Sequence, residues 1–323
     1  MKQLDAEILR WLTTENETSA IDSTIIEKDY YIVQLVQLLQ EQTFTHNDLA
    51  FELVFGGGTS LSKCFNLITR FSEDLDFKVV FNTQSLSRGN AQKIRSDVKK
   101  QIHSSIQNSD LLQIAGECVA RDENRSLKWK IIFPLLNPPL EGMRDYISLD
   151  VQFVEGLDYP TLNRPMGSMV TAVAGQPAEV TELKCIDPIE TTTDKIAAIS
   201  WRFLNRMKNE SIYEMQTIRH LYDLYYLSHL IHKLAPDERL VFRDHVQRKS
   251  DADAQIRLKK DTIHIISWQK RLEKTVELLT EDQRFNQEYD RFVIEYQIDS
   301  KEYIPYQEII NTFQQLTNLL KNL

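Results

Sequence analysis

The stretch that most constrains this chain is residues 55–77, FGGGTSLSKCFNLITRFSEDLDF, where a run of glycines precedes a pair of aspartates. The apolar residues 53–55 read as a short buried strand. The glycines at 56–58 follow, and they leave the backbone N–H groups open to an approaching anion. Thr59 and Ser60 are good N-cap residues. The pattern therefore predicts a strand, a glycine turn and a helix whose N-terminus faces the same anion.

The helix is predicted to continue past the glycines, because apolar residues recur at helical spacing from Leu61 to Ile68. The chain then alternates with period two over residues 75–81, which predicts a strand. Alternate side chains of a strand share a face, so Asp74 and Asp76 are predicted to point the same way. The intervening apolar residues are predicted to face a core.

Two carboxylates that lie side by side repel each other, and a hard cation such as Mg²⁺ removes that repulsion. Mg²⁺ takes oxygen ligands and is normally completed by substrate phosphates and water. Three glycines alone usually mark a tight turn, and a lone Asp-x-Asp is usually a solvated strand face. Their combination, with a helix-length segment between them, favours a nucleotide site that also holds metal.

Composition narrows the class of protein. The 323 residues allow one large domain or two smaller ones, and 42% hydrophobic with 26% charged residues is ordinary for a globular protein. Cys64, Cys118 and Cys185 are widely separated and odd in number, which favours neither a disulfide framework nor a zinc site. We therefore expect a cytoplasmic protein, with neither a signal peptide nor a membrane span.

A net charge of −9 argues against non-specific binding of nucleic acid by the whole surface, although a local basic patch remains open. Residues 85–108 form a basic segment, predicted to be an exposed helix that begins near Ser87. Such a run is usually a solvated face, and the alternative is a nucleic-acid contact. Its cationic residues are Arg88, Lys93, Arg95, Lys99, Lys100 and His103.

The remaining segments predict strands in the first half of the chain and helices in the second. Helices are expected at 3–13 and 24–41, the second opening with a capping box. Strands are expected at 112–120, 128–135, 146–154 and 180–186, and the breaker-rich residues 155–180 are predicted to form a loop.

We expect one domain at 1–175 that includes the N-terminal helices and a mainly helical domain at 176–323. In the strand at 146–154, Asp150 lies on the polar face, and an ordinary exposed sheet-face aspartate is the alternative.

A helix is predicted after Thr191-Thr192-Thr193-Asp194, which are N-cap candidates. Lys195 and Arg202 share its face opposite the apolar stripe, where they can meet a triphosphate or an RNA backbone. The next predicted helix, at 218–234, contains Arg219 and Asp223 four residues apart, so a surface ion pair is the alternative to a functional role.

Gly-Gly-Thr/Ser, a helix and then a strand with Asp-x-Asp resemble the signature of the nucleotidyltransferase superfamily related to DNA polymerase β. More closely, GGGTSLSKCFNLITRFSEDLDF is similar to the AbiEii-type toxins of abortive-infection and toxin–antitoxin systems, which include the mycobacterial MenT toxins. The resemblance implies an α+β fold, with a polymerase-β-like mixed sheet, flanking helices and a mainly helical C-terminal half completing the site. It also implies an enzyme that transfers a nucleotide from an NTP and releases pyrophosphate.

The resemblance further implies a division of roles. Asp74, Asp76 and Asp150 would hold Mg²⁺. The register of the motif does not distinguish Asp74 from Asp76 as the dominant metal ligand, so both stay open. Lys195 and Asp223 would support catalysis. The residues expected to contact the nucleotide are Gly57, Gly58, Thr59, Ser60, Lys63, Ser72, Lys195 and Arg202.

The implied acceptor is the 3′ end of tRNA, whose modification would block aminoacylation and translation, and the implied partner is an antitoxin encoded nearby. Two alternatives remain. One is a nucleotidyltransferase that modifies a protein or a small molecule, and the other is a catalytically silent nucleotide-binding module.

Overall fold

The computed structural model describes residues 2–14, 21–47, 49–81, 86–140, 143–206, 215–257, 266–296 and 303–323. The chain divides into two compact units. Unit 1 consists of Met1–Asn66 and Phe71–Asp187, and unit 2 consists of Leu67–Arg70 and Pro188–Leu323. The predicted domain boundary at 175/176 lies before residue 188, where the second unit resumes, and it stays a prediction.

Among the described residues, unit 1 forms an eight-stranded mixed sheet in the order β5-β7-β8-β4-β3-β10-β9, with β6 paired to β7. Strand β4 is antiparallel to β3 and parallel to β8. A separate hairpin joins β1 (Phe44–His46) and β2 (Leu49–Phe51). The strands of the large sheet are β3 (Leu53–Gly56), β4 (Asp74–Val80), β5 (Gln113–Ile114), β6 (Val119–Arg121), β7 (Ser126–Ile132), β8 (Ile147–Val154), β9 (Leu162–Met166) and β10 (Val180–Cys185).

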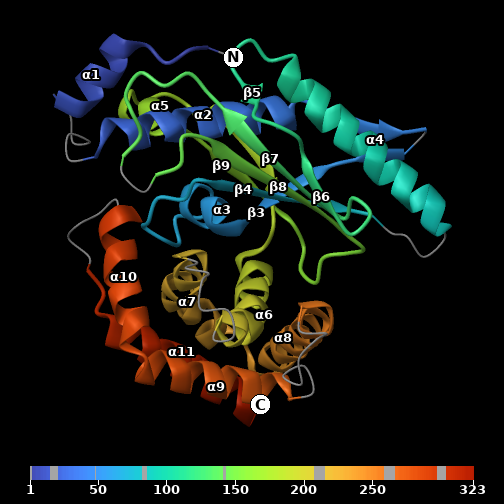
Figure 1. Cartoon of the computed structure of the whole chain (residues 1–323), viewed down its shortest axis with the longest axis vertical. Helices are drawn as coiled ribbons and strands as arrows, with labels where there is room; N and C mark the ends of the chain where they lie inside the picture. Colours follow the sequence, from blue (N-terminus) through green and yellow to red (C-terminus); the bar gives the residue numbers. More distant parts are fainter. Residues whose placement is uncertain are drawn as a thin grey trace. The chain divides into compact units, whose positions relative to one another are not determined.

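Helices cover one face of this sheet (Figure 1). They are α1 (Ala6–Thr14), α2 (Ser23–Gln40), α4 (Arg88–Gln107) and α5 (Met169–Val173). The strand residues under them are apolar at alternate positions and almost fully buried, as Phe77, Trp129 and Leu149 illustrate. The other face carries Asp74, Asp76 and Asp150, which are only partly buried. Period-two alternation therefore builds a core on one face and leaves a polar face on the other.

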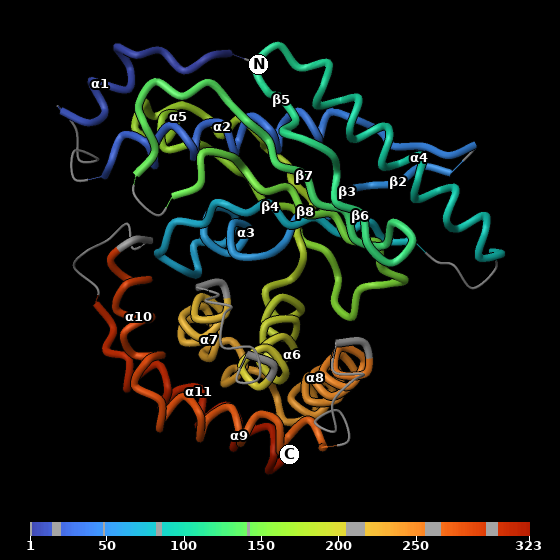
Figure 2. Tube along the Cα trace, viewed as in Figure 1, coloured from blue at the N-terminus to red at the C-terminus, as the bar shows by residue number. Residues whose placement is uncertain are grey.

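The segment from β3 to β4 differs from the prediction in the length of its helix. Helix α3 (Gly57–Lys63) starts at the second glycine, with Gly56 at the N-cap position, so Thr59 and Ser60 lie within the helix. Figure 2 shows the chain passing from β3 through this short helix into β4. The helix ends before Ile68. Phe65 and Ile68, which continue the helical spacing of apolar residues, lie in the irregular segment that follows it.

Unit 2 is helical, and its helices surround a core of aliphatic and aromatic side chains that includes Phe203, Tyr222 and Phe313. Helix α6 begins at Pro188, a residue suited to the first helical turn. The predicted N-cap run at 191–194 was therefore wrong, since it lies inside the helix. The helices of this unit are α6 (Pro188–Arg206), α7 (Met215–Lys233), α8 (Pro236–Arg257), α9 (Trp268–Glu281), α10 (Gln283–Tyr296) and α11 (Tyr306–Asn322).

The predicted fold class is confirmed: the chain is α+β, with a mixed sheet and a mostly helical C-terminal half. Several local predictions were wrong. The strand expected at 112–120 is the two short strands β5 and β6, and the loop expected at 155–180 contains β9 and α5. Helix α2 is capped by the Asp22 side chain, which accepts from the Thr24 N–H, instead of by a capping box. No described helix has the length and apolar character of a membrane span.

Candidate active site

Strand register aligns a glycine, two carboxylates and a lysine across four neighbouring strands of unit 1. Gly56 pairs with Asp76, Asp76 pairs with Asp150, and Asp150 pairs with Lys128. Paired residues of adjacent strands project from the same face of the sheet, so these side chains form one row. We call Asp76 and Asp150 the carboxylate pair. Their adjacency brings together residues that are far apart in the sequence.

Gly57 lies directly against this row. Its φ is +72°, a conformation that non-glycine residues rarely adopt. A Cβ atom at this position would lie 2.0 Å from Oδ2 of Asp76, far inside van der Waals contact. The turn therefore requires glycine for two independent reasons. An anion bound to the backbone here would meet a carboxylate, so the arrangement calls for a cation between them.

Thr59 fastens α3 to the start of β4. Its hydroxyl donates to the main-chain carbonyl of Ser72 at 3.3 Å and also to that of Asp74. Thr59, Ser60 and Ser72 are all buried. The hydroxyl of Thr59 is thus occupied by backbone, and the Thr59 side chain fixes the position of the strand that carries the aspartates.

Lys63, at the last turn of α3, forms an ion pair with the buried carboxylate of Asp29 on α2. The second oxygen of Asp29 accepts from the Met169 N–H at the start of α5, at 2.7 Å. This contact ties three helices of unit 1 together. It directs the Lys63 amine to a structural carboxylate, and its contact with nucleotide stays a prediction.

Asp74 belongs to a buried charge network that the sequence analysis did not foresee. Arg144 donates to Asp74 Oδ1 at 2.6 Å and to Glu73 Oε1 at 2.8 Å, and Lys28 donates to Glu73 Oε2 at 2.5 Å. Burial lowers the pKa of Lys28, an effect that Glu73 opposes. Burial likewise opposes the charge of Arg144, but Asp74 and Glu73 together raise its pKa. Arg144 is therefore a fixed cation beside Asp74.

The Asp150 side chain is held by a residue of β7 and a residue of its own strand. Oδ2 of Asp150 accepts from Lys128 Nζ at 3.0 Å and from the Ser148 hydroxyl at 2.9 Å. The Asp150 side chain is 25% exposed and that of Lys128 is 39% exposed. Exposed lysine pairs are weak, because water competes for both charges. The Lys128 contact can therefore exchange more readily than the Arg144 contact, in which one guanidinium binds two carboxylates.

Within unit 2, Asp223 accepts from two cations. Arg70 Nε and a terminal nitrogen donate to its two oxygens at 2.7 and 2.8 Å, and Lys195 Nζ donates at 2.6 Å. The side chains of Asp223, Arg70 and Lys195 are 0%, 4% and 6% exposed. Burial would raise the pKa of Asp223, but Arg70 and then Lys195 outweigh it, so the pKa is lowered. Asp223 is thus paired with Arg70 and Lys195 in the interior of unit 2, whereas the sequence had left open a surface ion pair with Arg219.

His220 of unit 2 lies among the positively charged side chains that also surround Asp223. Burial lowers the pKa of His220 well below its usual range, and Lys195, Arg202, Arg219 and Arg70 lower it further. His220 is therefore neutral. The guanidinium of Arg202 stacks 5.5 Å from the ring centroid of Trp201, which follows Ser200 on α6. Its predicted contact with nucleotide stays a prediction.

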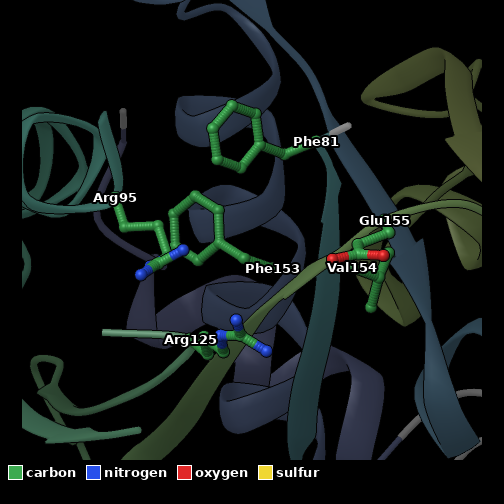
Figure 3. Close-up of a pocket in the computed structure, with 6 residues that line it drawn as sticks. All are labelled: Phe81, Arg95, Arg125, Phe153, Val154 and Glu155. Carbon is green, nitrogen blue, oxygen red and sulfur yellow. The ribbon is translucent and has the colours of Figure 1, made fainter. Parts of the chain in front are cut away.

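A small cavity lies at the opposite end of β4 and β8 from the aspartates (Figure 3). Its volume is about 20 Å³, enough for about one water molecule and too small for a nucleotide. Figure 3 shows Arg95 beside the ring of Phe153, with Arg125 further from both phenylalanine rings. The lining residues are Phe81, Arg95, Arg125, Phe153, Val154 and Glu155.

The structure brings together some of the predicted residues and adds others. In unit 1 it aligns Gly57, Asp76 and Asp150, and in unit 2 it joins Lys195 to Asp223. Within the described ranges, no group of three or more His, Cys, Asp or Glu side chains is gathered as a ready metal site. Sequence reasoning missed four charged residues that contact the predicted ones, and only pairing between distant segments reveals them: Asp29, Arg70, Lys128 and Arg144.

Two solved structures are similar to the chain over nearly its whole length. The chain resembles MenT4, a nucleotidyltransferase toxin from Mycobacterium tuberculosis, at 18% identity and a TM-score of 0.48, covering 97% of this chain and 99% of that one. A protein from H. pylori described as a nucleotidyltransferase is 12% identical with a TM-score of 0.42, covering 94% and 96%. No curated protein is significantly similar to the chain.

A family match covers most of the sequence. Residues 37–310 match the family described as nucleotidyl transferase AbiEii toxin, type IV TA system. A nucleotidyltransferase uses an NTP, and a toxin of such a system is paired with an antitoxin. The glycine turn and the carboxylate pair both lie within the matched residues. The chain therefore belongs to the AbiEii family of nucleotidyltransferase toxins of type IV toxin–antitoxin systems.

Proposed function

We propose that this toxin transfers a nucleoside monophosphate from an NTP to the 3′ end of tRNA and thereby blocks translation. The observation that carries the reaction is the row in which Gly57 adjoins Asp76 and Asp76 pairs with Asp150. A phosphate-binding turn beside two carboxylates is suited to phosphoryl chemistry. The tRNA acceptor comes from the family resemblance, so it is the part of the proposal that most needs a test.

The donor set fits a hard divalent cation. Asp76 and Asp150 offer carboxylate oxygens from adjacent strands, and no soft ligand is paired with them in the row. These two residues would hold Mg²⁺, with Asp74 as a further ligand through the oxygen that Arg144 does not engage. When bound, Mg²⁺ neutralises phosphate charge and lowers the pKa of the attacking hydroxyl. The fixed Arg144 contact favours Asp76 over Asp74 as the dominant ligand.

The chain's own residues then position the reactants. The backbone of Gly57, Gly58 and Thr59 binds the nucleotide phosphates, with Ser60 and Ser72 beside it. Asp150 takes the proton of the acceptor hydroxyl as that oxygen bonds to the α-phosphorus. The bond from the α-phosphorus to the bridging oxygen breaks, and pyrophosphate leaves.

We further propose that Lys195 stabilises charge on the phosphates, with Arg202 assisting, and that Asp223 positions Lys195. The 2.6 Å contact from Lys195 to Asp223 supports the second role. Arg70 shares Asp223 with Lys195, so both cations contribute to holding this carboxylate in place.

Transfer of label from each α-³²P-labelled NTP in turn, with Mg²⁺ and total tRNA, tests this function. Label on tRNA that disappears in the Asp76→Ala variant would support both reaction and acceptor, and would identify the nucleotide. Label on protein or small molecules from a cell extract, with none on RNA, would reject the tRNA acceptor and keep the enzyme. Nucleotide binding without any pyrophosphate release would indicate a silent module.

A further inference from the structure

Cationic residues border the carboxylate pair on the polar face of the sheet. Lys128 on β7 pairs with Asp150, and Lys130, two residues further along, pairs with Ser148 on β8. On the adjacent edge strand β6, Arg121 pairs with Ser126 of β7. Residues two apart on a strand share a face, so these three cations lie on the same face as Asp150. We call Arg121, Lys128 and Lys130 the cationic strip.

The strip is accessible and is held in place from below. Lys130 and Arg121 are exposed, and within the described ranges no ion pair is formed by either side chain. The Lys130 amine lies 5.0 Å from the ring centroid of Tyr146, a cation–π contact that directs it toward β8. Trp129, between the two lysines, is fully buried in the opposite face and fixes the strand. The strand that carries the two lysines is therefore fixed, while the charged side chains of the strip remain accessible.

The charge of the strip contrasts with that of the whole chain. The net charge is −9, yet these cations occur together on β6 and β7, immediately beside the carboxylate pair. Alternate residues on a strand are about 6.6 Å apart, a spacing comparable with that of successive phosphates in an extended nucleic-acid strand. A small anionic ligand needs one such cation. A row of them suits a polyanion.

We propose that the cationic strip binds the sugar–phosphate backbone of a single-stranded RNA 3′ end and directs its terminal hydroxyl to Asp150. This inference rests on the proposed function and names the surface that receives the acceptor. Lys128 holds the position nearest Asp150. When it turns to an acceptor phosphate, it releases Oδ2 of Asp150, so acceptor binding and exposure of the carboxylate occur together.

Helix α4 is the competing basic surface. It belongs to the helical layer on the other face of the sheet (Figure 1), and three of its cations, Arg88, Arg95 and Lys100, already have partners. Arg88 forms an ion pair with Glu123, and the buried Arg95 donates to the Glu123 carbonyl at 2.9 Å. Lys93 and Lys100 are exposed on α4, where Lys100 lies 3.5 Å from Asp97 Oδ1, and together they serve as the control for the strip.

The test compares RNA affinity of two double variants, Arg121→Gln/Lys130→Gln and Lys93→Gln/Lys100→Gln, each removing two exposed charges. Filter binding of total tRNA, without NTP, is measured from low to physiological salt. Loss of two single-strand phosphate contacts should reduce the slope of log K against log salt by roughly 1.4. We expect this reduction, and at least tenfold weaker binding at low salt, in the strip variant alone. Both variants should keep the wild-type thermal midpoint, because the four side chains are exposed.

Other outcomes would overturn the inference. Equal slopes for the wild type and the strip variant, or a reduction only in the α4 variant, would reject the strip while leaving the transfer reaction intact. If the wild type binds no RNA at any salt concentration, the strip is rejected. Label transfer by the wild type decides the acceptor separately: label on RNA keeps the RNA acceptor while the strip fails, and no label on RNA rejects the acceptor as well.

Discussion

Substitution of alanine for Gly57 tests the contact between the glycine turn and the carboxylate pair. The new Cβ would lie 2.0 Å from Asp76 Oδ2 and 2.7 Å from its Cγ, so both atoms cannot stay in place. Either the Asp76 side chain leaves its position or the turn moves away from β4. Both responses disrupt the arrangement on which phosphate binding depends.

The cost has two parts that can be separated. A left-handed conformation costs an alanine about 1–2 kcal/mol relative to glycine. Displacement of Asp76 adds a catalytic loss, because a misplacement of about 1 Å in a reacting group can lower the rate about 100-fold. We therefore expect Gly57→Ala to unfold at lower urea concentration by this modest amount and to lose at least about 100-fold in transfer rate.

Gly116→Ala is the matched control. Gly116 has the same φ of +72°, but no atom lies within 4 Å of the Cβ that alanine would add. This variant should show the conformational cost in urea unfolding and retain its transfer rate. Nearly wild-type transfer by Gly57→Ala, or equal rate losses in the two variants, would refute the role assigned to the contact with Asp76.

Three further predictions concern the ion pairs of Asp223 and Asp74. Asp223→Asn should lower the free energy of unfolding by about 3–5 kcal/mol in urea titrations, because it leaves Arg70 and Lys195 buried without their shared carboxylate. Because the folded pKa of Asp223 is lowered, the stability that this carboxylate contributes is complete above the unfolded pKa of about 3.9 and is lost as pH falls through the folded pKa. The free energy of unfolding of Asp223→Asn, measured against pH, should lack that acid-dependent decline. An acid dependence equal to that of the wild type would contradict the prediction. Arg144→Met removes a cation 2.6 Å from Asp74 and should lower the half-saturating Mg²⁺ concentration for transfer, whereas an increase would contradict the assignment of this site.

Local patterns in the sequence are sufficient to predict the strand with Asp74 and Asp76, because side-chain alternation needs no knowledge of neighbours. The same reasoning identifies Asp150 on a polar strand face, but its position opposite Asp76 depends on the parallel pairing of β4 with β8. That pairing joins segments more than 70 residues apart, and no local signal specifies its register. The charged contacts from Lys128 and Arg144 depend on the same distant pairing.

The predicted end of helix α3 was wrong for a different physical reason. The apolar residues from Leu61 to Ile68 have helical spacing, yet α3 ends at Lys63. The chain then leaves unit 1, because Leu67–Arg70 belong to unit 2. There Arg70 is bound by Asp223, which the sequence could associate only with Arg219, its neighbour at helical spacing. Tertiary ion pairs override such local spacing.

The most direct test of the central claim follows both ends of the NTP during reaction. The four NTPs labelled at the α-phosphate, and in parallel at the γ-phosphate, are incubated with Mg²⁺, tRNA and either the wild type, Asp76→Asn or Gly116→Ala. We predict α label on RNA and γ label in pyrophosphate for the wild type and Gly116→Ala, and neither for Asp76→Asn. Transfer of γ label to the acceptor, or undiminished α transfer by Asp76→Asn, would contradict nucleotidyl transfer at the carboxylate pair.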